Sequence, residues 1–458
     1  MSKIAILLPD GVGLRNFIYS DFIPKLEAAG NEVYVWNGTV FPVAEMGYKE
    51  IPLQGNINPQ TDIIKNVRKR YELQRSYQLT KNSIYLGYEF KVPLFKSARG
   101  FIKKILSLPY HINGLSHANT DWFAKRMENS ERKTGYYRKC RQQLLEYGID
   151  KVFCTNQRPV VAVAPLTAAK DLGVETSSFI FSWDNLPKAT MVVNTDKYFV
   201  WSDYMKKELM YYYPYIKEEN IAVVGTPQFM PHFDEKIIMD RTDFFETLSL
   251  DPNRKYLCFS GDDITTSPYD QLYLRDMAEQ VRSYNSLHNE NYAILFRRCP
   301  VDFSGRYDAI IKGYRDVVFL AEPLWENRGN GWNFAMPTIE DQKRLVNTIH
   351  HSILTINVGS SIVFDAACHQ SPTCYINYNV EGTNREWDIN KIYKYIHFRS
   401  MPSQDVVYWL NSKNSLSVIL EELEQTKQEV IHEAEKWFQV ICSNPTNSID
   451  TLVKSLSC

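Results

Sequence analysis

A glycine followed by two serines marks the stretch of this chain best suited to bind an anionic ligand. The apolar run 353–357 leads into Gly359, and Ser360 and Ser361 stand directly before a helix-like run. Glycine lets the backbone approach a ligand, and a helix N-terminus carries partial positive charge, so this turn predicts a phosphate site. Asp365, one helical turn further on, is placed to bind a ribose or sugar hydroxyl. The alternative is structural: a serine caps the helix, and Asp365 favours its first turns.

Two arginines form a second candidate contact to a phosphate. Arg297 and Arg298 close the apolar run 293–297, which reads as a strand. An arginine at the end of a strand can bind a phosphate through two parallel hydrogen bonds. The alternative is an ion pair on the protein surface.

A pair of aspartates follows another strand-like run. Gly261, Asp262 and Asp263 come directly after the run 256–260. In an open α/β sheet, ligands bind at the carboxyl ends of the strands, so these residues are predicted ligand contacts. Two adjacent carboxylates could suggest a metal, but no third ligand is evident, and we expect no metal site.

Residues 181–188, FSWDNLPK, carry polar and aromatic groups after a strand-like run in the first half of the chain. Trp183 could stack on a sugar, and Asp184 and Asn185 could bind its hydroxyls. The alternative is an Asx-turn that joins a strand to a helix.

The elements that must position these motifs predict a doubly wound α/β protein. Strand-like and helical runs alternate in the first 36 residues, again after residue 148, and a second set begins at residue 256. A chain of 458 residues is too long for one ordinary core, so we predict two Rossmann-like domains. The predicted parts are an N-terminal domain at 1–228 with a basic, aromatic insertion at about 55–140, a linker at 229–253, a C-terminal domain at 254–415, and a helix at 416–458 that packs back toward the first domain.

The Ser-Ser segment resembles the nucleotide-binding element of GT-B enzymes of bacterial surface-polysaccharide synthesis. It is similar to the Ser-Ser motif of GT-B sialyltransferases and to the Ser-Ser-x-x-x-Asp element of CDP-glycerol glycerophosphotransferases, and residues 181–188 resemble a stretch of glycosyltransferase-like proteins. The resemblance implies a GT-B fold, in which two Rossmann-like domains face each other across a cleft and a C-terminal helix crosses back. It also implies that Ser360 and Ser361 contact the donor phosphate, with Asp365 as the matching acid.

The resemblance also bears on the first turn of the chain. In GT-B enzymes this turn faces the acceptor, and sialyltransferases of the class carry an Asp-Gly motif whose Asp is the general base. Asp10 and Gly11 match that motif. Asp10 is therefore the candidate base and Asp184 the second candidate, because an inverting transfer needs a group that takes the proton of the acceptor hydroxyl. The implied acceptor contacts are Gly11, Gly13, Arg15, Trp183 and Asn185.

One departure from those families concerns Arg297 and Arg298. They precede Cys299 and Pro300, where the families keep a His-Pro pair. The missing histidine puts in doubt the role that the families assign to it, such as protonation of the leaving phosphate.

Charge is unevenly distributed along the chain. Residues 61–141 hold 18 Lys and Arg against 6 Asp and Glu, although the net charge of the whole chain is −1. Clustered cations among Phe and Leu fit an anionic membrane surface or a lipid-diphosphate acceptor. A solvated surface that pairs with the acidic remainder is the alternative. We expect no nucleic-acid partner, because no recognised motif accompanies the charge.

Cysteine usage and hydropathy indicate a cytoplasmic protein. The eight cysteines stand singly without a CxxC pair, which predicts reduced thiols and neither a disulfide framework nor a zinc site. The short apolar run at the N-terminus predicts no secretory signal, and no run is long enough to span a bilayer. We therefore expect a cytoplasmic location, with peripheral contact to the inner face of the plasma membrane through residues 61–141.

Together these features predict a metal-independent GT-B glycosyltransferase without a cofactor. It would move a sugar from a nucleotide-activated donor, with a CMP or CDP link suggested by the Ser-Ser resemblance, to a cell-surface glycan or a lipid-linked acceptor. Two alternatives on the same scaffold are a CDP-glycerol-type transferase of a polyol phosphate and a sugar-nucleotide epimerase. A third alternative is a non-catalytic, nucleotide-binding member of a glycan-assembly complex.

Overall fold

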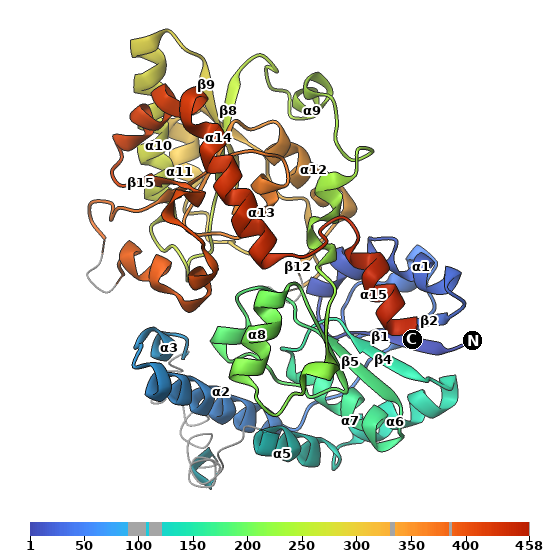
Figure 1. The fold of residues 1–458 in the computed structure, drawn as a ribbon. Helices are drawn as coiled ribbons and strands as arrows, with labels where there is room; N and C mark the ends of the chain where they lie inside the picture. Colours follow the sequence, from blue (N-terminus) through green and yellow to red (C-terminus); the bar gives the residue numbers. More distant parts are fainter. Residues whose placement is uncertain (90–106, 110–120, 330–334, 384–386, 458) are drawn as a thin grey trace. The chain divides into compact units, whose positions relative to one another are not determined.

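The computed structural model describes residues 1–89, 107–109, 121–329, 335–383 and 387–457. The chain divides into two compact units. The first unit comprises Met1–Pro227 and Ile441–Cys458, and the second comprises Gln228–Val440. Each unit is built on a parallel β-sheet (Figure 1).

Seven strands of the described chain form the parallel sheet of the first unit. Their alternating side chains divide between two faces. Ala5 and Leu7 point to the face shared with Val152 and Cys154, whereas Phe153 points to the other, where it meets Phe17 and Phe22. The strand order across the sheet is β3 (Glu50–Pro52), β2 (Glu32–Asn37), β1 (Lys3–Leu8), β4 (Lys151–Cys154), β5 (Glu175–Phe179), β6 (Lys197–Val200) and β7 (Ile221–Val223).

Helices cover both faces of this sheet (Figure 1). On the face of Ala5 and Leu7, apolar residues of four helices complete the core. These helices are α2 (Pro59–Thr80), α5 (Asp121–Glu131), α6 (Gly135–Tyr147) and α7 (Val163–Asp171). The other helices of the unit are the π-helix η1 (Leu14–Ile18), α1 (Phe22–Ala28), α3 (Ile84–Gly87), α8 (Asp203–Tyr212) and the C-terminal α15 (Ser448–Ser457).

The C-terminal segment returns to the first unit and is fixed there by backbone contacts. The N–H of Ser443 donates to the carbonyl of Trp201 at 2.8 Å, and α15 packs against α1. Gly225 lies where the chain crosses this segment: its φ is +77°, and a Cβ would lie 2.3 Å from the carbonyl oxygen of Ser443. Only glycine fits both the left-handed conformation and the close approach.

The second unit contains a six-stranded parallel sheet and a two-stranded antiparallel ribbon within the described residues. The strands at its centre are almost completely buried, which explains their continuous apolar runs. The order across the sheet is β10 (Val318–Leu320), β9 (Tyr292–Arg297), β8 (Lys255–Ser260), β13 (Leu354–Asn357), β14 (Thr373–Ile376) and β15 (Tyr408–Leu410), and the ribbon pairs β11 (Trp325–Asn327) with β12 (Ala335–Pro337).

Aromatic packing joins the start and the end of the second unit. Phe229 meets Phe438 edge-on with ring centroids 4.9 Å apart, and Phe364 meets Trp437 at 4.8 Å. The long helix α14 therefore packs on α13 and on the segment that enters the unit. The helices are α9 (Arg241–Thr247), α10 (Asp270–His288), α11 (Asp308–Gly313), α12 (Ile339–His350), α13 (Ile362–Ala367) and α14 (Ser415–Ile441).

The predicted fold class is confirmed by the two parallel sheets with helices and by the C-terminal return. Residues 229–253, predicted as a linker, begin the second unit and contain α9. The described parts of the basic insertion form α2, α3, α5 and the start of α6. The remainder of the insertion, 90–106 and 110–120, lies outside the described residues.

Candidate active site

Asp10 lies at the carboxyl edge of the first sheet and is held from two sides. β1 and β4 are parallel neighbours, so the turns that follow them meet at this edge. Oδ2 of Asp10 accepts a hydrogen bond from Nδ2 of Asn156 at 2.9 Å, and Oδ1 accepts one from the N–H of Val12 at 3.3 Å. Burial raises the pKa of Asp10 to about 6, against these hydrogen bonds and the charge of Arg158. Such a carboxylate is ionised at neutral pH and can still accept a proton.

A hydrogen-bond network extends from this edge to residues 181–188. Gln157 donates from Nε2 to Oδ1 of Asn185 at 3.0 Å, and its Oε1 accepts from the N–H of Phe181 at 3.0 Å. Asn185 in turn donates to Oδ1 of Asp184 at 2.8 Å. The sequence pointed to Asp10, Asp184 and Asn185 separately, and the structure links all three through the dipeptide Asn156-Gln157. The sequence analysis missed this dipeptide, although its position directly after a predicted strand was a usable signal.

Three of the other residues predicted to contact the acceptor, Gly11, Gly13 and Trp183, are buried in the first unit. A Cβ on Gly13 would lie 2.6 Å from side-chain atoms of Leu8 and Thr155, so close packing explains this glycine. Trp183 is 5% exposed, and in this conformation its ring packs inside the unit. Gly11 is buried and accepts a hydrogen bond from the N–H of Leu14, which starts η1. Arg15, in η1, is partly exposed.

Asn16 is a second residue that sequence analysis did not single out. It lies in η1, is 1% exposed, and both polar atoms of its amide lack a hydrogen-bond partner in the described part of the chain. A buried amide without partners is costly. Short π-helical segments are often found at functional sites. Asn16 is therefore a further candidate functional residue at this sheet edge.

In the second unit, three predicted ligand segments end neighbouring strands. β9, β8 and β13 are adjacent and parallel, so their carboxyl ends share one edge of the sheet. The predicted segments that follow these strands are Arg297–Arg298, Gly261–Asp263 and Gly359–Ser361. The structure therefore brings them to one edge, as their positions after strand-like runs predicted.

The Gly359 turn has a shape that only glycine supports. Its φ is +66°, and a Cβ would lie 3.0 Å from Ile392 and 3.1 Å from Phe398. Asn357 holds the turn by accepting a hydrogen bond from the N–H of Ser360 at 2.7 Å. Ser361 stands at the start of α13 without a side-chain capping hydrogen bond. Both serines are partly exposed, and the hydroxyl of Ser360 accepts a hydrogen bond from the N–H of Ile362 at 3.5 Å.

Asp262 lies against this turn, and its carboxylate accepts a hydrogen bond from the backbone of Val358. Burial, together with the carboxylates of Asp270 and Asp263, raises the pKa of Asp262 well above its usual range. Tyr307 donates to Oδ2 of Asp270 at 2.7 Å, and the N–H of Asp262 donates to the same oxygen at 3.1 Å. The raised pKa of Asp262 lowers the repulsion that its carboxylate would exert on an anion at the turn.

Asp263 has a different environment from its neighbour. Its carboxylate accepts hydrogen bonds from the backbone and the hydroxyls of Thr265 and Thr266. Although burial opposes it, this hydrogen bonding lowers the pKa of Asp263. Through these hydrogen bonds, Asp263 stabilises the loop at residues 263–266.

Arg297 forms a buried ion pair. Its Nη2 donates to both carboxylate oxygens of Asp341, at 2.8 and 2.9 Å, and its Nη1 has no hydrogen-bond partner among the described residues. Arg298 pairs at the surface with Asp308 and Glu322. Burial raises the pKa of the Cys299 thiol to about 12, so the residue that replaces the expected histidine stays protonated at neutral pH. Arg297 is thus fixed by Asp341, with one donor group unused.

Asp365 belongs to a chain of histidines. Its Oδ1 lies 2.8 Å from Nε2 of His232, and Nδ1 of His232 lies 2.8 Å from Nε2 of His369. His350 continues the chain, with its Nδ1 3.2 Å from Nδ1 of His369. Asp365 is 6% exposed, so it orients His232 inside the second unit. The sequence analysis missed this cluster because its members are far apart along the chain.

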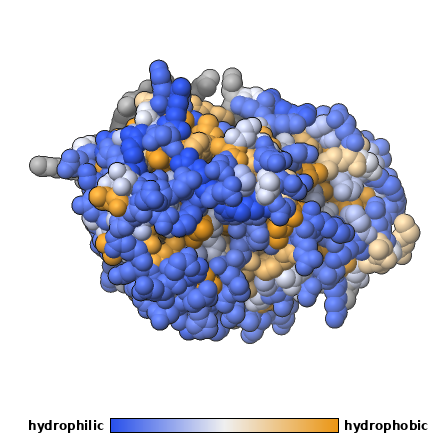
Figure 2. Space-filling model, turned by 90° about the horizontal axis from the view of Figure 1, so that it is seen from above, coloured by the Kyte–Doolittle hydropathy of each residue, from blue (hydrophilic) through white to orange (hydrophobic). Residues whose placement is uncertain are grey.

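Within the described ranges, no group of three or more His, Cys, Asp or Glu side chains is arranged to hold a metal ion. No helix of those ranges is long and apolar enough to cross a membrane. The face seen in Figure 2 is mostly hydrophilic, with apolar side chains in separate patches. The cysteines of the described chain are free.

No protein-family model and no curated protein matches this chain. Solved structures do share its fold. A glycosyltransferase from Rickettsia africae superposes with a TM-score of 0.53 at 10% identity, covering 100% of this chain and 97% of that one. A putative UDP-N-acetylglucosamine 2-epimerase from Listeria monocytogenes gives 0.54 at 9% identity, with 99% and 95% covered. MnaA of S. aureus, solved with UDP, gives 0.51 at 10% identity, with 100% and 96% covered. At these identities the likeness shows the fold alone, which is the GT-B-like fold expected from the sequence.

Proposed function

We propose that this protein is a glycosyltransferase that moves a sugar from a nucleotide-activated donor to a hydroxyl of a glycan or lipid-linked acceptor. The observation that carries the proposal is the state of Asp10. It is a partly buried carboxylate with a pKa of about 6, fixed by Asn156 at the carboxyl edge of a Rossmann-like sheet. A base tuned toward neutrality suits removal of the proton from an attacking hydroxyl. Asp184 is less suited, because Lys188 already pairs with its carboxylate.

The donor nucleotide would bind the second unit at the Gly359 turn. The hydroxyls of Ser360 and Ser361 would donate to its phosphate. The raised pKa of Asp262 beneath the turn favours binding of an anion at this site. The unused Nη1 of Arg297 is a further donor at the same edge of the sheet.

Product analysis by NMR tests this function against the alternatives on the same fold. The purified chain is incubated with a nucleotide sugar, with and without a polyol or glycan acceptor. A transferase releases nucleotide in step with consumption of the acceptor. An epimerase converts the donor without an acceptor, and conversion of that kind would contradict the proposal. The same panel run with CDP-glycerol identifies a polyol-phosphate transferase.

A further inference from the structure

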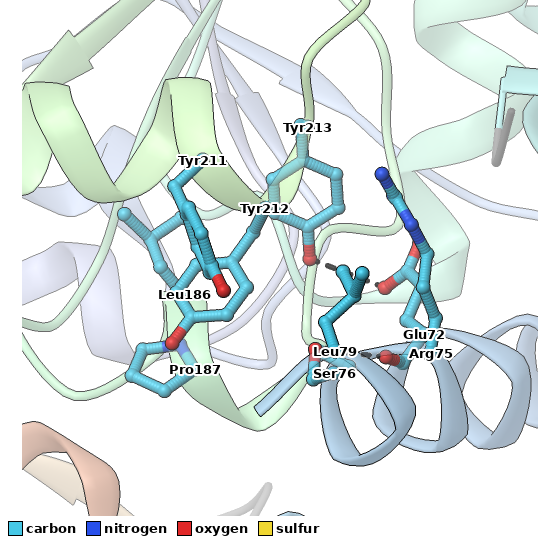
Figure 3. Close-up of a pocket in the computed structure, with 10 residues that line it drawn as sticks. Glu72, Arg75, Ser76, Leu79, Leu186, Pro187, Tyr211, Tyr212 and Tyr213 are labelled. Carbon is cyan, nitrogen blue, oxygen red and sulfur yellow. Dashed lines mark hydrogen bonds between the residues drawn. The ribbon is translucent and has the colours of Figure 1, made fainter. Parts of the chain in front are cut away.

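A pocket of the second unit is large enough to hold a small ligand, whereas one in the first unit is not. The pocket of the first unit, between α2 and the residues Leu186 and Pro187 (Figure 3), encloses about 20 Å³. That volume holds about one water molecule. The pocket of the second unit encloses about 320 Å³. This volume falls at the lower end of the range of small-molecule sites, about 300–1,000 Å³.

The larger pocket lies where two neighbouring strands of the second sheet end. Asn377 follows β14 directly and Asn411 follows β15, and these strands are parallel neighbours. The remaining lining residues come from the short helix η8 (Ile389–Lys394) and from Gln404 and Trp409. Ligands of open α/β sheets bind at this carboxyl edge. We call this cavity the asparagine pocket, because three of its seven lining residues are asparagines.

Tyr393 joins the asparagine pocket to the Gly359 turn. Its ring lines the pocket and stacks on Tyr375 with centroids 5.4 Å apart, and its Cε1 lies 3.3 Å from where a Cβ on Gly359 would be. Gly359, Ser360 and Ser361 themselves do not line the pocket. The pocket is therefore a neighbour of the proposed phosphate site with side chains of its own.

The amide side chains of the pocket suit a hydroxyl ligand. Asn377 donates from Nδ2 to Oδ1 of Asn411 at 2.8 Å. This bond leaves the amide oxygen of Asn377 and the amide nitrogen of Asn411 side by side. A hydroxyl both donates and accepts hydrogen bonds, so such a pair can bind it through both functions. Asn390 and Gln404 add two more amides, and none of the described lining residues carries a carboxylate.

Two aromatic rings give the pocket a rigid carbon surface. The rings of Tyr393 and Trp409 meet edge-on with centroids 4.8 Å apart. Their polar atoms are used inside the protein: the hydroxyl of Tyr393 donates to the carbonyl of Ile376, and Nε1 of Trp409 donates to the carbonyl of Gln404. The electron-rich face of an aromatic ring attracts the positive edge of C–H groups. Amides beside fixed rings match a sugar, which has C–H groups on its faces and hydroxyls at its rim.

We propose that the asparagine pocket binds a sugar residue of a glycan chain, at a site separate from that of the nucleotide-activated donor. Four of its lining residues are exposed, so a sugar held there can stay linked to the rest of a chain; these are Asn390, Lys394, Gln404 and Asn411. The site would keep a growing glycan on the protein between successive transfers. That use rests on the proposed function, whereas binding of the sugar does not.

Saturation-transfer NMR on the full chain tests the site with the methyl glycosides of glucose, galactose, N-acetylglucosamine and glucuronic acid. We expect the wild type to transfer saturation to at least one of them. Trp409→Ala should abolish the transfer, and Trp409→Phe, which keeps a ring, should retain it. Asn411→Ala should weaken binding by about three- to tenfold, the usual worth of a hydrogen bond. No transfer to any of the four glycosides would overturn the proposal.

A matched control comes from the same loop as Asn411. Asn414 is also exposed and also accepts a hydrogen bond from a side-chain amide, that of Gln280 at 3.3 Å, but it does not line the pocket. Asn414→Ala should leave glycoside binding unchanged. Equal binding by wild type, Asn411→Ala and Trp409→Ala would place the sugar elsewhere and overturn the proposal. Because Asn411 is exposed, its variant tests the site even if Trp409→Ala does not fold.

The panel also distinguishes two classes of sugar. Stronger binding of the glucuronide than of the glucoside, with the preference lost in Lys394→Gln, supports the site and identifies an acidic sugar. Equal binding of the two supports the site and identifies a neutral sugar.

Nucleotide binding on the same variants distinguishes failure of this inference from failure of the proposed function. Asn411→Ala should leave nucleotide affinity unchanged, and the double variant Ser360→Ala, Ser361→Ala should leave glycoside binding unchanged. Loss of glycoside binding in the double variant would show that the sugar belongs to the donor site, which contradicts a separate site. Nucleotide binding without glycoside binding overturns the sugar site alone, and glycoside binding without nucleotide binding contradicts the proposed function alone.

Discussion

Asn156 donates a hydrogen bond to Asp10 across the edge where β1 and β4 end, with 2.9 Å between Nδ2 and Oδ2. The pairing of two parallel strands brings these residues together from positions 146 apart in sequence. The hydrogen bond orients a carboxylate that burial has made more basic than a free aspartate. Asp10 is therefore the residue of the first sheet that is the candidate for taking the proton of an acceptor hydroxyl.

Asp10→Asn is expected to lower kcat by about 10²- to 10⁴-fold, the usual contribution of a general base. The amide is isosteric and keeps a hydrogen-bond acceptor for the N–H of Val12, so the fold should persist. Steady-state kinetics with a nucleotide sugar and an acceptor make the measurement. Nucleotide affinity serves as the control and should not change, because Asp10 belongs to the first unit. A variant that retains full turnover would rule Asp10 out as the base.

The pH dependence of stability should reveal the same carboxyl group. Its pKa is raised from 3.8 to about 6 on folding, so its stabilising contribution is present below pH 3.8 and is lost as the pH rises through 6. The shift corresponds to about 3 kcal/mol. Asp10→Asn should therefore raise the free energy of unfolding at pH 7.5 by up to about this amount, with little gain at pH 4. Urea denaturation at the two pH values checks it, and equal effects at both would refute the assigned pKa.

Much of this arrangement was predictable from sequence, and the reasons are physical. Continuous apolar runs such as 353–357 mark buried parallel strands, and ligand residues follow such runs because the carboxyl ends of parallel strands share an edge. Gly359 was recognisable as the turn between a strand-like run and a helix-like run, and its left-handed φ of +66° is a finding of the structure. The assignment of donor and acceptor roles to these residues remains a prediction.

The partners of the site residues were not predictable. Asp341 is 44 positions from Arg297, and His232 is 133 positions from Asp365. Such pairs form only when the sheet and its helices are assembled, and no local pattern encodes them.

Asp341→Asn should destabilise the protein strongly. The substitution leaves the guanidinium of Arg297 buried without its counter-charge, which typically costs about 3–5 kcal/mol. Asp308→Asn is the matched control, because Asp308 pairs with Arg298 at an exposed position and should cost about 1 kcal/mol or less. Chemical denaturation of both variants measures the difference. Similar losses in the two would contradict a structural role for the buried pair.

The histidine cluster should make the second unit sensitive to acid. Burial and the neighbouring His232, His350 and His351 lower the pKa of His369 to about 3. A depressed pKa means that the unfolded chain binds more protons below pH 6.5, so stability present above that value is lost as the pH falls. Thermal melts should show His369→Asn losing less stability than wild type between pH 7.5 and pH 5. An identical loss would show that His369 does not carry this acid sensitivity.

The central claim is that the chain uses a nucleotide-activated donor, and a thermal-shift panel with CMP, CDP, UDP, GDP and dTDP tests it most directly. A ligand that binds only the folded state stabilises it by about 2.7 kcal/mol at a hundredfold excess over Kd. We predict that one of these nucleotides raises the Tm of the wild type, and that the shift disappears in the double variant Ser360→Ala, Ser361→Ala. No shift with any nucleotide, or an equal shift in the double variant, would contradict the account.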